Sequence, residues 1–169
     1  MSEKGVHQPF GILKSFESSS MVEKNYKWHR RFISLADHVA QWSKDPSTKC
    51  GSVIVDNKQR IISLGYNGLA RGVKDLPERL LTRELKYELT IHAEENALLF
   101  ANGKNLEGCT LYVTPLPTCV RCASKVIQSG ISTVVAPVLP KHLVERWGDS
   151  VELSKEIFKE ANVRFIELS

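Results

Sequence analysis

Four residues in two short segments have the types and spacing of a catalytic zinc site. His92 and Glu94 stand two apart, and Cys119 and Cys122 stand three apart further along the chain. An imidazole and two thiolates are good zinc ligands, and a catalytic zinc takes three protein ligands and keeps its fourth position for water. A carboxylate beside that water can take its proton and later return it. The pattern therefore predicts metal-assisted hydrolysis, with Glu94 as the proton carrier.

The same spacing predicts which local structures present these side chains. Residues three apart share one face of a helix, so a helix beginning near Cys119 presents both thiols to one ion. The dipole at its N-terminus favours the thiolate form. Residues two apart point away from each other within a regular helix, so His92 and Glu94 face one metal only if a helix begins at His92. We therefore expect helices over residues 92–101 and 119–129.

Taken singly, each of these features has an ordinary structural explanation. A lone histidine is usually a structural residue, and a glutamate in a first helical turn is usually a solvated partner of the helix dipole. A lone C-x-x-C pair is as often half of a structural zinc site or a redox pair. Their occurrence together, in this order and each at a predicted helix start, favours the catalytic interpretation.

Length and composition indicate one globular domain. The chain has 169 residues, of which 42% are hydrophobic and 25% are charged, and this is enough to bury a substantial core. No apolar run is long enough for a membrane span, and the start lacks the apolar core of a signal peptide. We expect a cytoplasmic protein with no membrane partner. Two of the four cysteines are assigned to metal, and we expect the others, Cys50 and Cys109, to be small core residues.

The charge of the chain is mildly basic. A formal net charge of +4 suits anionic ligands such as nucleotides. Lys and Arg do not gather in a run of the kind that a polynucleotide partner usually requires. We therefore expect a small-molecule ligand and no nucleic-acid polymer.

The order of predicted elements indicates an α/β fold. Residues 1–25 are polar and aperiodic, so we expect a flexible N-terminal extension, followed by a single domain over residues 26–169. Strands alternating with helices bury their apolar faces best as a mixed sheet with helices on both sides, a three-layer α/β/α sandwich. Besides the two metal helices, the expected elements are helices at 26–43, 82–88 and 151–161, strands at 52–56, 60–66, 110–114, 131–136 and 163–168, and a loop at 137–150.

Several segments together resemble the zinc-dependent cytidine/deoxycytidylate deaminase superfamily, and within it the deoxycytidylate (dCMP) deaminase branch. The H-x-E and later C-x-x-C elements match the known signature of zinc nucleobase deaminases. The form H-A-E-x-N-A and the G-Y-N-G segment look like the dCMP deaminase branch. The segments that carry the resemblance are Ser43–Lys49, Gly65–Gly68 with Arg71 and Gly72, His92–Ala97, and Leu111–Ala123.

The resemblance implies more than the residues alone. It implies a five-stranded mixed sheet, one catalytic zinc per subunit, and a homo-oligomer (a hexamer or another multiple of dimers). It also implies control by dCTP and dTTP in many members, with Mg²⁺ expected to accompany a triphosphate effector. His92, Cys119 and Cys122 match the zinc ligands, and Glu94 matches the proton carrier. Asn67 matches a substrate-contacting residue, although an Asn-Gly pair also has a plain turn-forming explanation.

Two departures from the family pattern concern the metal segment. The proline that usually precedes the first cysteine stands one position early, at Pro117, and we expect Thr118 to serve as the N-cap of the cysteine helix. The segment between Gly68 and His92 lacks the Cys and His residues that bind a second zinc in some members, so we expect one ion.

A nucleotide substrate requires groups that bind its 5′-phosphate. Lys44, Thr48 and Arg71 lie in segments expected at the mouth of the pocket, and with Asn67 they are the predicted substrate contacts. The alternative for each cation is a solvated charged face. Arg121, between the two cysteines, is expected to temper thiolate charge, to contact a phosphate or to point into water. Further candidates for the phosphate are Ser47 and Lys49, and at greater distance Arg79, Arg83 and Lys86.

The predicted reaction is hydrolysis of dCMP to dUMP and ammonia. Two alternatives remain at this point. Adenosine deamination in tRNA would use the same zinc chemistry and would show an affinity for tRNA that falls steeply with salt. A non-catalytic, zinc-stabilised nucleotide sensor would have a closed four-ligand metal site and no need for Glu94.

Overall fold

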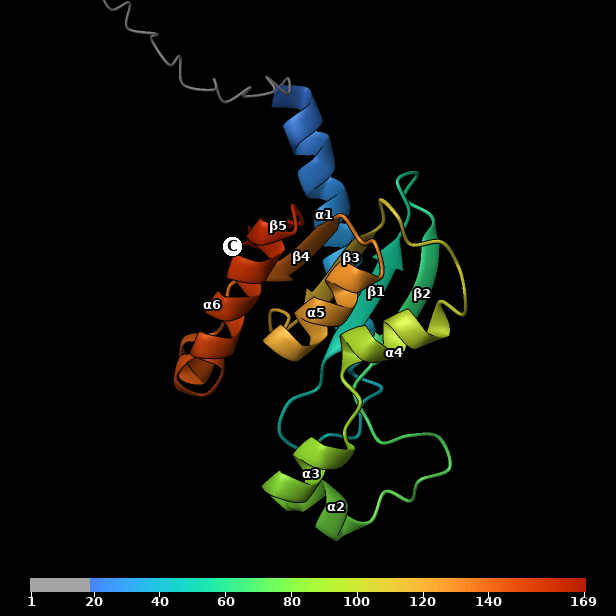
Figure 1. The fold of residues 1–169 in the computed structure, drawn as a ribbon, viewed down its shortest axis with the longest axis vertical. Coiled ribbons are helices and arrows are strands. Elements are labelled where there is room, and N and C mark those ends of the chain that lie inside the picture. The colour runs from blue at the N-terminus through green and yellow to red at the C-terminus, as the bar shows by residue number, and fades with distance from the viewer. Residues whose placement is uncertain (1–18) are drawn as a thin grey trace, which may run out of the picture.

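A five-stranded mixed sheet forms the centre of the fold. The computed structural model describes residues 19–169, so the predicted extension lies outside them except for its last residues. The strand order is β2-β1-β3-β4-β5; β1 is antiparallel to β2 and β3, whereas β3, β4 and β5 run parallel (Figure 1). The predicted five-stranded mixed sheet is confirmed. The strands are β1 (Gly51–Val55), β2 (Ile61–Tyr66), β3 (Thr110–Thr114), β4 (Thr133–Pro137) and β5 (Arg164–Leu168).

Helices cover both faces of this sheet, as predicted. Helix α1 (Ser19–Ala40) packs on one face, where Phe32 and Ala36 join buried residues of β1, β3 and β4. On the other face, α4 (Ala93–Phe100), α5 (Val120–Gln128) and α6 (Val144–Glu160) bury Ala97, Val126 and Phe158 against the sheet. Two short helices, α2 (Pro77–Leu81) and α3 (Arg83–Leu89), lie together beyond one end of the sheet (Figure 1).

Two helix starts differ from the sequence prediction. Helix α1 begins at Ser19, before the expected start at residue 26. The expected loop at 137–150 is wrong for most of its length, because a 3-10 turn at Lys141–Leu143 leads into α6 at Val144. Pro140 suggested a loop, but it precedes the helix, and the one glycine within the helix, Gly148, costs only about 1 kcal/mol relative to alanine. Burial of Val151 and Phe158 offsets that cost.

The close packing of α4 on β2 depends on the absence of a side chain at Gly65. A Cβ atom there would overlap the backbone oxygen of Ala93 and the backbone nitrogen of Ala97. The helix is also tied to β2 by hydrogen bonds: Asn96 Nδ2 donates to the Tyr66 carbonyl at 2.7 Å, and Ser63 Oγ donates to the Ala97 carbonyl at 2.6 Å. Because α4 carries Glu94, Gly65 fixes the distance between the sheet and the predicted proton carrier.

Replacing Gly65 by Ala is therefore expected to destabilise the protein. Overpacking of this kind typically costs about 1–3 kcal/mol, and here the clash is with backbone, which cannot rotate away. Urea denaturation of the two proteins measures the loss. Gly68→Ala is the matched control, because a Cβ there meets nothing within 4 Å. Equal stability of the two variants would show that α4 is not held at this distance.

Candidate active site

The three predicted metal ligands meet at the N-termini of two adjacent helices. His92 is the N-cap of α4 and Cys119 is the N-cap of α5, with Cys122 in the first turn of α5. His92 Nδ1 lies 3.4 Å from Cys119 Sγ and 3.2 Å from Cys122 Sγ. The possible ligand atoms of the three residues all lie within 4.8 Å of one another. The helices predicted to begin at His92 and Cys119 begin at Ala93 and Val120, one residue later than predicted.

The group fits a catalytic zinc ion. Zinc bonds of about 2.0–2.1 Å to nitrogen and about 2.3 Å to sulfur, at tetrahedral angles, hold N and S about 3.6 Å apart. The observed separations are within a few tenths of an ångström of this value. Within residues 19–169, no fourth His, Cys, Asp or Glu completes the group. Three ligands with a free fourth position is the arrangement of a catalytic rather than a structural site.

One of the two thiols, that of Cys119, is prepared for metal binding, whereas the hydrogen bond with Cys119, together with burial, raises the pKa of Cys122. The neighbouring Cys122 thiol outweighs the effect of burial and lowers the pKa of Cys119 to about 4, with His92 contributing in the same direction. Cys119 also stands at a helix N-terminus, where a negative charge is favoured. A divalent cation would draw the remaining proton from Cys122, since metal binding displaces protons from its ligands.

Glu94 is a buried carboxylate at the wall of the same cavity. Its exposed fraction is 5%, and it borders the cavity together with His92 and Cys119. Burial raises the pKa of Glu94 to about 7, and the charge of Cys119 adds to the increase. A group of this kind exchanges protons near neutral pH, which suits general acid–base catalysis. Glu94 is not among the clustered ligand residues.

Glu95 and two cations, Arg121 and Lys125, form contacts beside the predicted metal ligands. Glu95 Oε1 accepts hydrogen bonds from the His92 backbone N–H at 3.4 Å and from Arg121 Nη2 at 3.1 Å, and Lys125 pairs with the same carboxylate. The cation contacts hold the pKa of Glu95 below its usual value despite partial burial. Of the three roles expected for Arg121, the structure thus favours none directly: its guanidinium pairs with Glu95.

The N-terminus of α5 differs from the prediction in its cap. Thr118 was expected to be the N-cap, but the N-cap is Cys119, and Thr118 Oγ1 is buried without a hydrogen-bond partner among the described residues. The Val120 backbone N–H donates instead to Ser150 Oγ at 3.0 Å. A side chain from α6 therefore satisfies the first turn of α5, which no local sequence rule could reveal.

A cavity at the protein surface is bordered by Glu94. The starts of α4 and α5, the loop after α1, the residue after β2, α3 and the start of α6 contribute to its walls. The predicted contacts Asn67 and Thr48 border it, and so does Cys50, which was expected in the core. Cys109 is buried in the core as expected. The other polar residues at its walls are Asp45, Ser47, Lys86, Thr90 and Arg146.

The side chain of Asn67 fixes the backbone beside the cavity. Its Oδ1 accepts from the Cys50 N–H at 2.8 Å, and its Nδ2 donates to the Thr48 carbonyl at 2.9 Å. The residue is 6% exposed. Asn67 thus joins the end of β2 to the loop before β1, so it has a structural role besides the predicted substrate contact.

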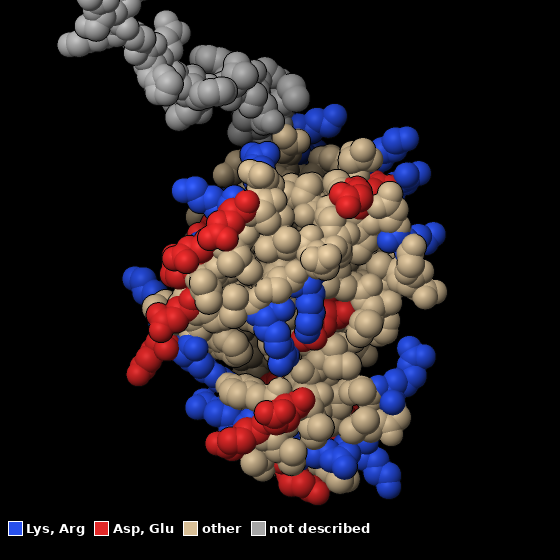
Figure 2. Space-filling model, in the orientation of Figure 1, with Lys and Arg blue, Asp and Glu red and all other residues tan. Residues whose placement is uncertain are grey.

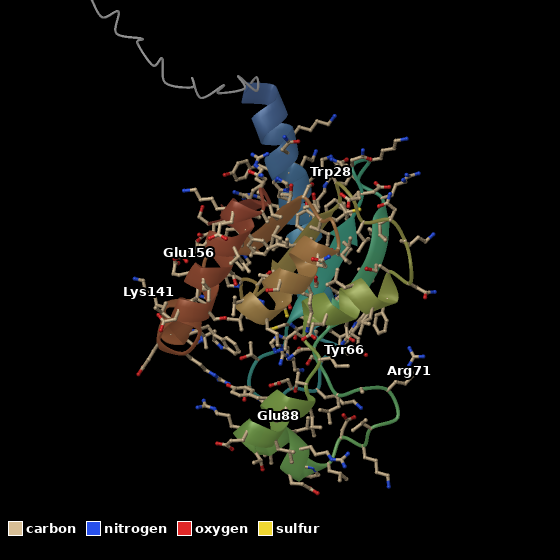
Figure 3. All side chains as sticks on the ribbon, viewed as in Figure 1. Trp28, Tyr66, Arg71, Glu88, Lys141 and Glu156 are labelled. Carbon is tan, nitrogen blue, oxygen red and sulfur yellow. The ribbon has the colours of Figure 1, made fainter. Side chains whose placement is uncertain are left out.

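Lys44 and Arg71 do not border this cavity. Lys44 is exposed and forms a 2.6 Å ion pair with Asp75 at a neighbouring depression. Arg71 lies on the long loop between β2 and α2, and its side chain points away from the domain (Figure 3). Lys44 and Arg71 lie in segments that are neither helix nor strand, where the position of a residue in the sequence does not predict where its side chain points.

Several residues at the cavity could not be placed there from the sequence alone. Lys86 is 5% exposed and donates to Asp45 Oδ1 at 3.1 Å and to Ser47 Oγ at 3.0 Å, which holds α3 against the loop after α1. No spacing rule links residues so far apart in the chain. Arg146 and Trp147 were placed in a loop, so their position on α6 facing the cavity could not be inferred.

Comparison with known proteins identifies the family. Residues 26–138 match the model of the cytidine and deoxycytidylate deaminase zinc-binding region. An uncharacterized deaminase encoded in the luxG 3′ region of Aliivibrio fischeri is 47% identical over 137 residues, covering 81% of this chain and 90% of that protein. The deoxycytidylate deaminase of Mus musculus is 36% identical over 146 residues, covering 82% of this chain and 78% of that protein. The chain belongs to the cytidine and deoxycytidylate deaminase family.

Solved structures share the fold at lower sequence identity. The dCMP deaminase of cyanophage S-TIM5, in complex with dCMP and dUMP, superposes with a TM-score of 0.63 at 19% identity, covering 90% of this chain and all of that one. Its apo form gives a TM-score of 0.65. The cytidine deaminase-like fold predicted from the sequence is confirmed. In the part of the chain that the structure describes, no helix has the length and apolar character needed to cross a bilayer.

Removal of one ligand is expected to abolish tight zinc binding. In a Cys122→Ser variant the affinity for zinc should fall at least about 100-fold, since even indirect ligand partners contribute 10- to 100-fold. Competition with a chromogenic chelator measures the affinity without reference to activity. The control is Cys109→Ala, which removes a buried thiol outside the ligand group. Unchanged affinity in Cys122→Ser would place the metal elsewhere.

Proposed function

We propose that this protein catalyses the zinc-dependent hydrolytic deamination of dCMP to dUMP and ammonia. The observation that carries the proposal is Glu94, a buried carboxylate at the wall of a cavity that His92 and Cys119 also border. Membership in the deaminase family supports the reaction class, and the names of the mammalian relatives support the substrate.

The residues of this chain divide the work as follows. His92, Cys119 and Cys122 would hold the zinc ion, which when bound lowers the pKa of water and so supplies the nucleophile for C4 of the cytosine ring. Glu94 accepts a proton from that water and delivers it to N3 of the ring. The proton of the hydroxyl then carried by C4 passes through Glu94 to the amino group, so that the C4–N bond breaks, the C4 carbonyl forms and ammonia leaves. Burial keeps the carboxylate close to the pKa at which it can perform both transfers.

Residues at the walls of the cavity are proposed to orient the nucleotide. Asn67 and Thr48 remain proposed substrate contacts, because both border the cavity. Asn67 is held in place by its two backbone hydrogen bonds, so its position does not depend on the substrate. Lys44 and Arg71 lie outside the cavity walls, and we assign them no contact within this chain.

A substrate panel tests the proposed reaction. Zinc-loaded protein is assayed for ammonia release from cytosine, deoxycytidine, dCMP, CMP, dCTP and an adenosine-containing tRNA. Preferential turnover of dCMP is the expected result. Preferential turnover of the tRNA would favour the adenosine deaminase alternative, and zinc binding without turnover of any compound would favour a nucleotide sensor.

We further propose a homo-oligomer that is controlled by dCTP and dTTP, with Mg²⁺ accompanying the triphosphate. Exposed apolar side chains on the adjacent elements α4 and β2 support self-association; they include Leu99, Phe100 and Ile61 at 64%, 52% and 52% exposure. Light scattering gives the oligomer size, and initial rates with and without dCTP–Mg²⁺ test the control. A monomer, or rates unaffected by either nucleotide, would contradict these assignments. The expected cytoplasmic location stays a prediction.

A further inference from the structure

Two of the four Lys and Arg residues that border the cavity and the hollow beside it have an acidic partner. Lys86 pairs with Asp45, and Arg121 pairs with Glu95. The cationic and acidic residues are also interspersed on the face of the molecule shown in Figure 2, with no broad surface of one sign. Arg146 borders the cavity, and Arg83 borders the hollow beside it. Neither arginine forms an ion pair with any residue in 19–169.

Arg146 reaches the cavity from the start of α6 and is held by aromatic rings. Its guanidinium carbon lies 5.0 Å from the ring centroid of Tyr87 on α3 and 5.5 Å from that of Trp147. The two rings also meet edge to face, with centroids 6.3 Å apart. Cation–π contacts leave the edge of the guanidinium free to donate hydrogen bonds. Arg146 borders the same cavity as Glu94.

Arg83 borders a hollow beside this cavity. It is the first residue of α3, and the hollow is also lined by Arg146, His92 and Cys119, which border the cavity as well. The two positive charges act on each other: burial, and then the charge of Arg83, lower the pKa of Arg146. The charge of Asp45, which pairs with Lys86, acts in the opposite direction. An anion between the two arginines would relieve their repulsion.

We propose that Arg146 and Arg83 bind the 5′-phosphate of the nucleotide substrate and make the enzyme selective for nucleotides over nucleosides. The assignment rests on the proposed function for the kind of substrate. Glu94 and Arg146 border the same cavity, so a pyrimidine placed against Glu94 can direct its phosphate to Arg146, with Arg83 in the hollow beside it. Guanidinium groups bind phosphate oxygens through paired hydrogen bonds. Of these two arginines, the sequence suggested only Arg83, as a more distant candidate; the role expected of Lys44 and Arg71 is here assigned to α3 and α6.

The test compares ligands that differ only in the phosphate. In Arg146→Gln and Arg83→Gln, kcat/KM for dCMP is expected to fall about 10- to 100-fold, the usual effect of losing a charged hydrogen bond. The rate with deoxycytidine should change less than about twofold. Calorimetric titration with dUMP and with deoxyuridine gives a second measurement that needs no turnover. The matched control is Arg31→Gln, because Arg31 also lies over a tryptophan ring, 4.6 Å from the centroid of Trp28, but on α1.

The outcomes separate the phosphate site from the reaction itself. Equal losses for dCMP and deoxycytidine, or no loss for either, would overturn the phosphate assignment. If wild-type protein deaminates no cytosine compound but binds dUMP through the two arginines, the proposed reaction fails and the phosphate site stands. If Arg146→Gln does not fold, Arg146→Lys and Arg83→Gln decide the matter. Lysine keeps the charge and should retain part of the preference for dUMP.

Discussion

Replacing Glu94 by Gln is expected to lower kcat for dCMP by about 10²- to 10⁴-fold, the usual contribution of a general acid–base group. Zinc content should stay that of the wild type, because Glu94 is not one of the three clustered ligands. Glutamine preserves the size of the side chain but cannot take up the proton. Steady-state kinetics and metal analysis on the same preparation measure both quantities.

The control for this variant is the same change at an exposed position. Glu88 lies on α3 with its side chain in solvent (Figure 3), so Glu88→Gln should keep wild-type kcat. A Glu94→Gln protein with a rate near that of the wild type would show that another group carries the proton. A Glu94→Gln protein that loses zinc would show that Glu94 belongs to the metal site.

Replacing Lys86 by Met is expected to destabilise the protein by about 3–5 kcal/mol, because it leaves the Asp45 carboxylate buried without a counterion. The side chains of Lys86 and Asp45 are 7% and 9% exposed, and they join α3 to the loop that borders the cavity. Asp45 Oδ1 also accepts the backbone N–H groups of Ser47 and Thr48, at 2.8 and 3.0 Å. Urea denaturation measures the loss of stability.

Two further variants show whether this effect comes from the buried pair. The double variant Lys86→Met with Asp45→Asn should be less destabilised than the sum of its single changes, because no charge is left unpaired. Lys44→Met breaks the exposed pair with Asp75 and should barely move the urea midpoint. If Lys86→Met and Lys44→Met have the same midpoint, the buried pair does not stabilise the fold.

The sheet and the clustering of the proposed zinc ligands could be predicted because their signals are local. The interval between Cys119 and Cys122 places both thiols in one helical turn, and the two-residue interval from His92 to Glu94 requires a helix start. Both requirements are met, with His92 and Cys119 each at an N-cap. Alternation of short apolar strands with helices likewise suffices to predict a mixed sheet with helices on both faces.

The part of the cavity that is formed by α3, α6 and the loop after α1 could not be predicted, because it depends on contacts between segments that are distant in the sequence. The Lys86–Asp45 pair joins residues 41 positions apart, and Ser150 caps the N-terminus of α5 from another helix. The position of Arg146 was missed because its segment, which begins at Pro137 and contains Pro140, was assigned to a loop. Arg71 was selected by position in the chain, yet its loop carries it away from the cavity (Figure 3).

The measurement that tests the central claim most directly is a zinc titration of the metal-free protein with dCMP deamination followed at each step. We predict that ammonia and dUMP form in equal amounts and that the rate rises in proportion to bound zinc, up to one ion per chain. Glu94→Gln should bind the same one ion and remain nearly inactive. A rate independent of zinc, or full zinc binding without formation of ammonia from dCMP, would contradict the proposed function.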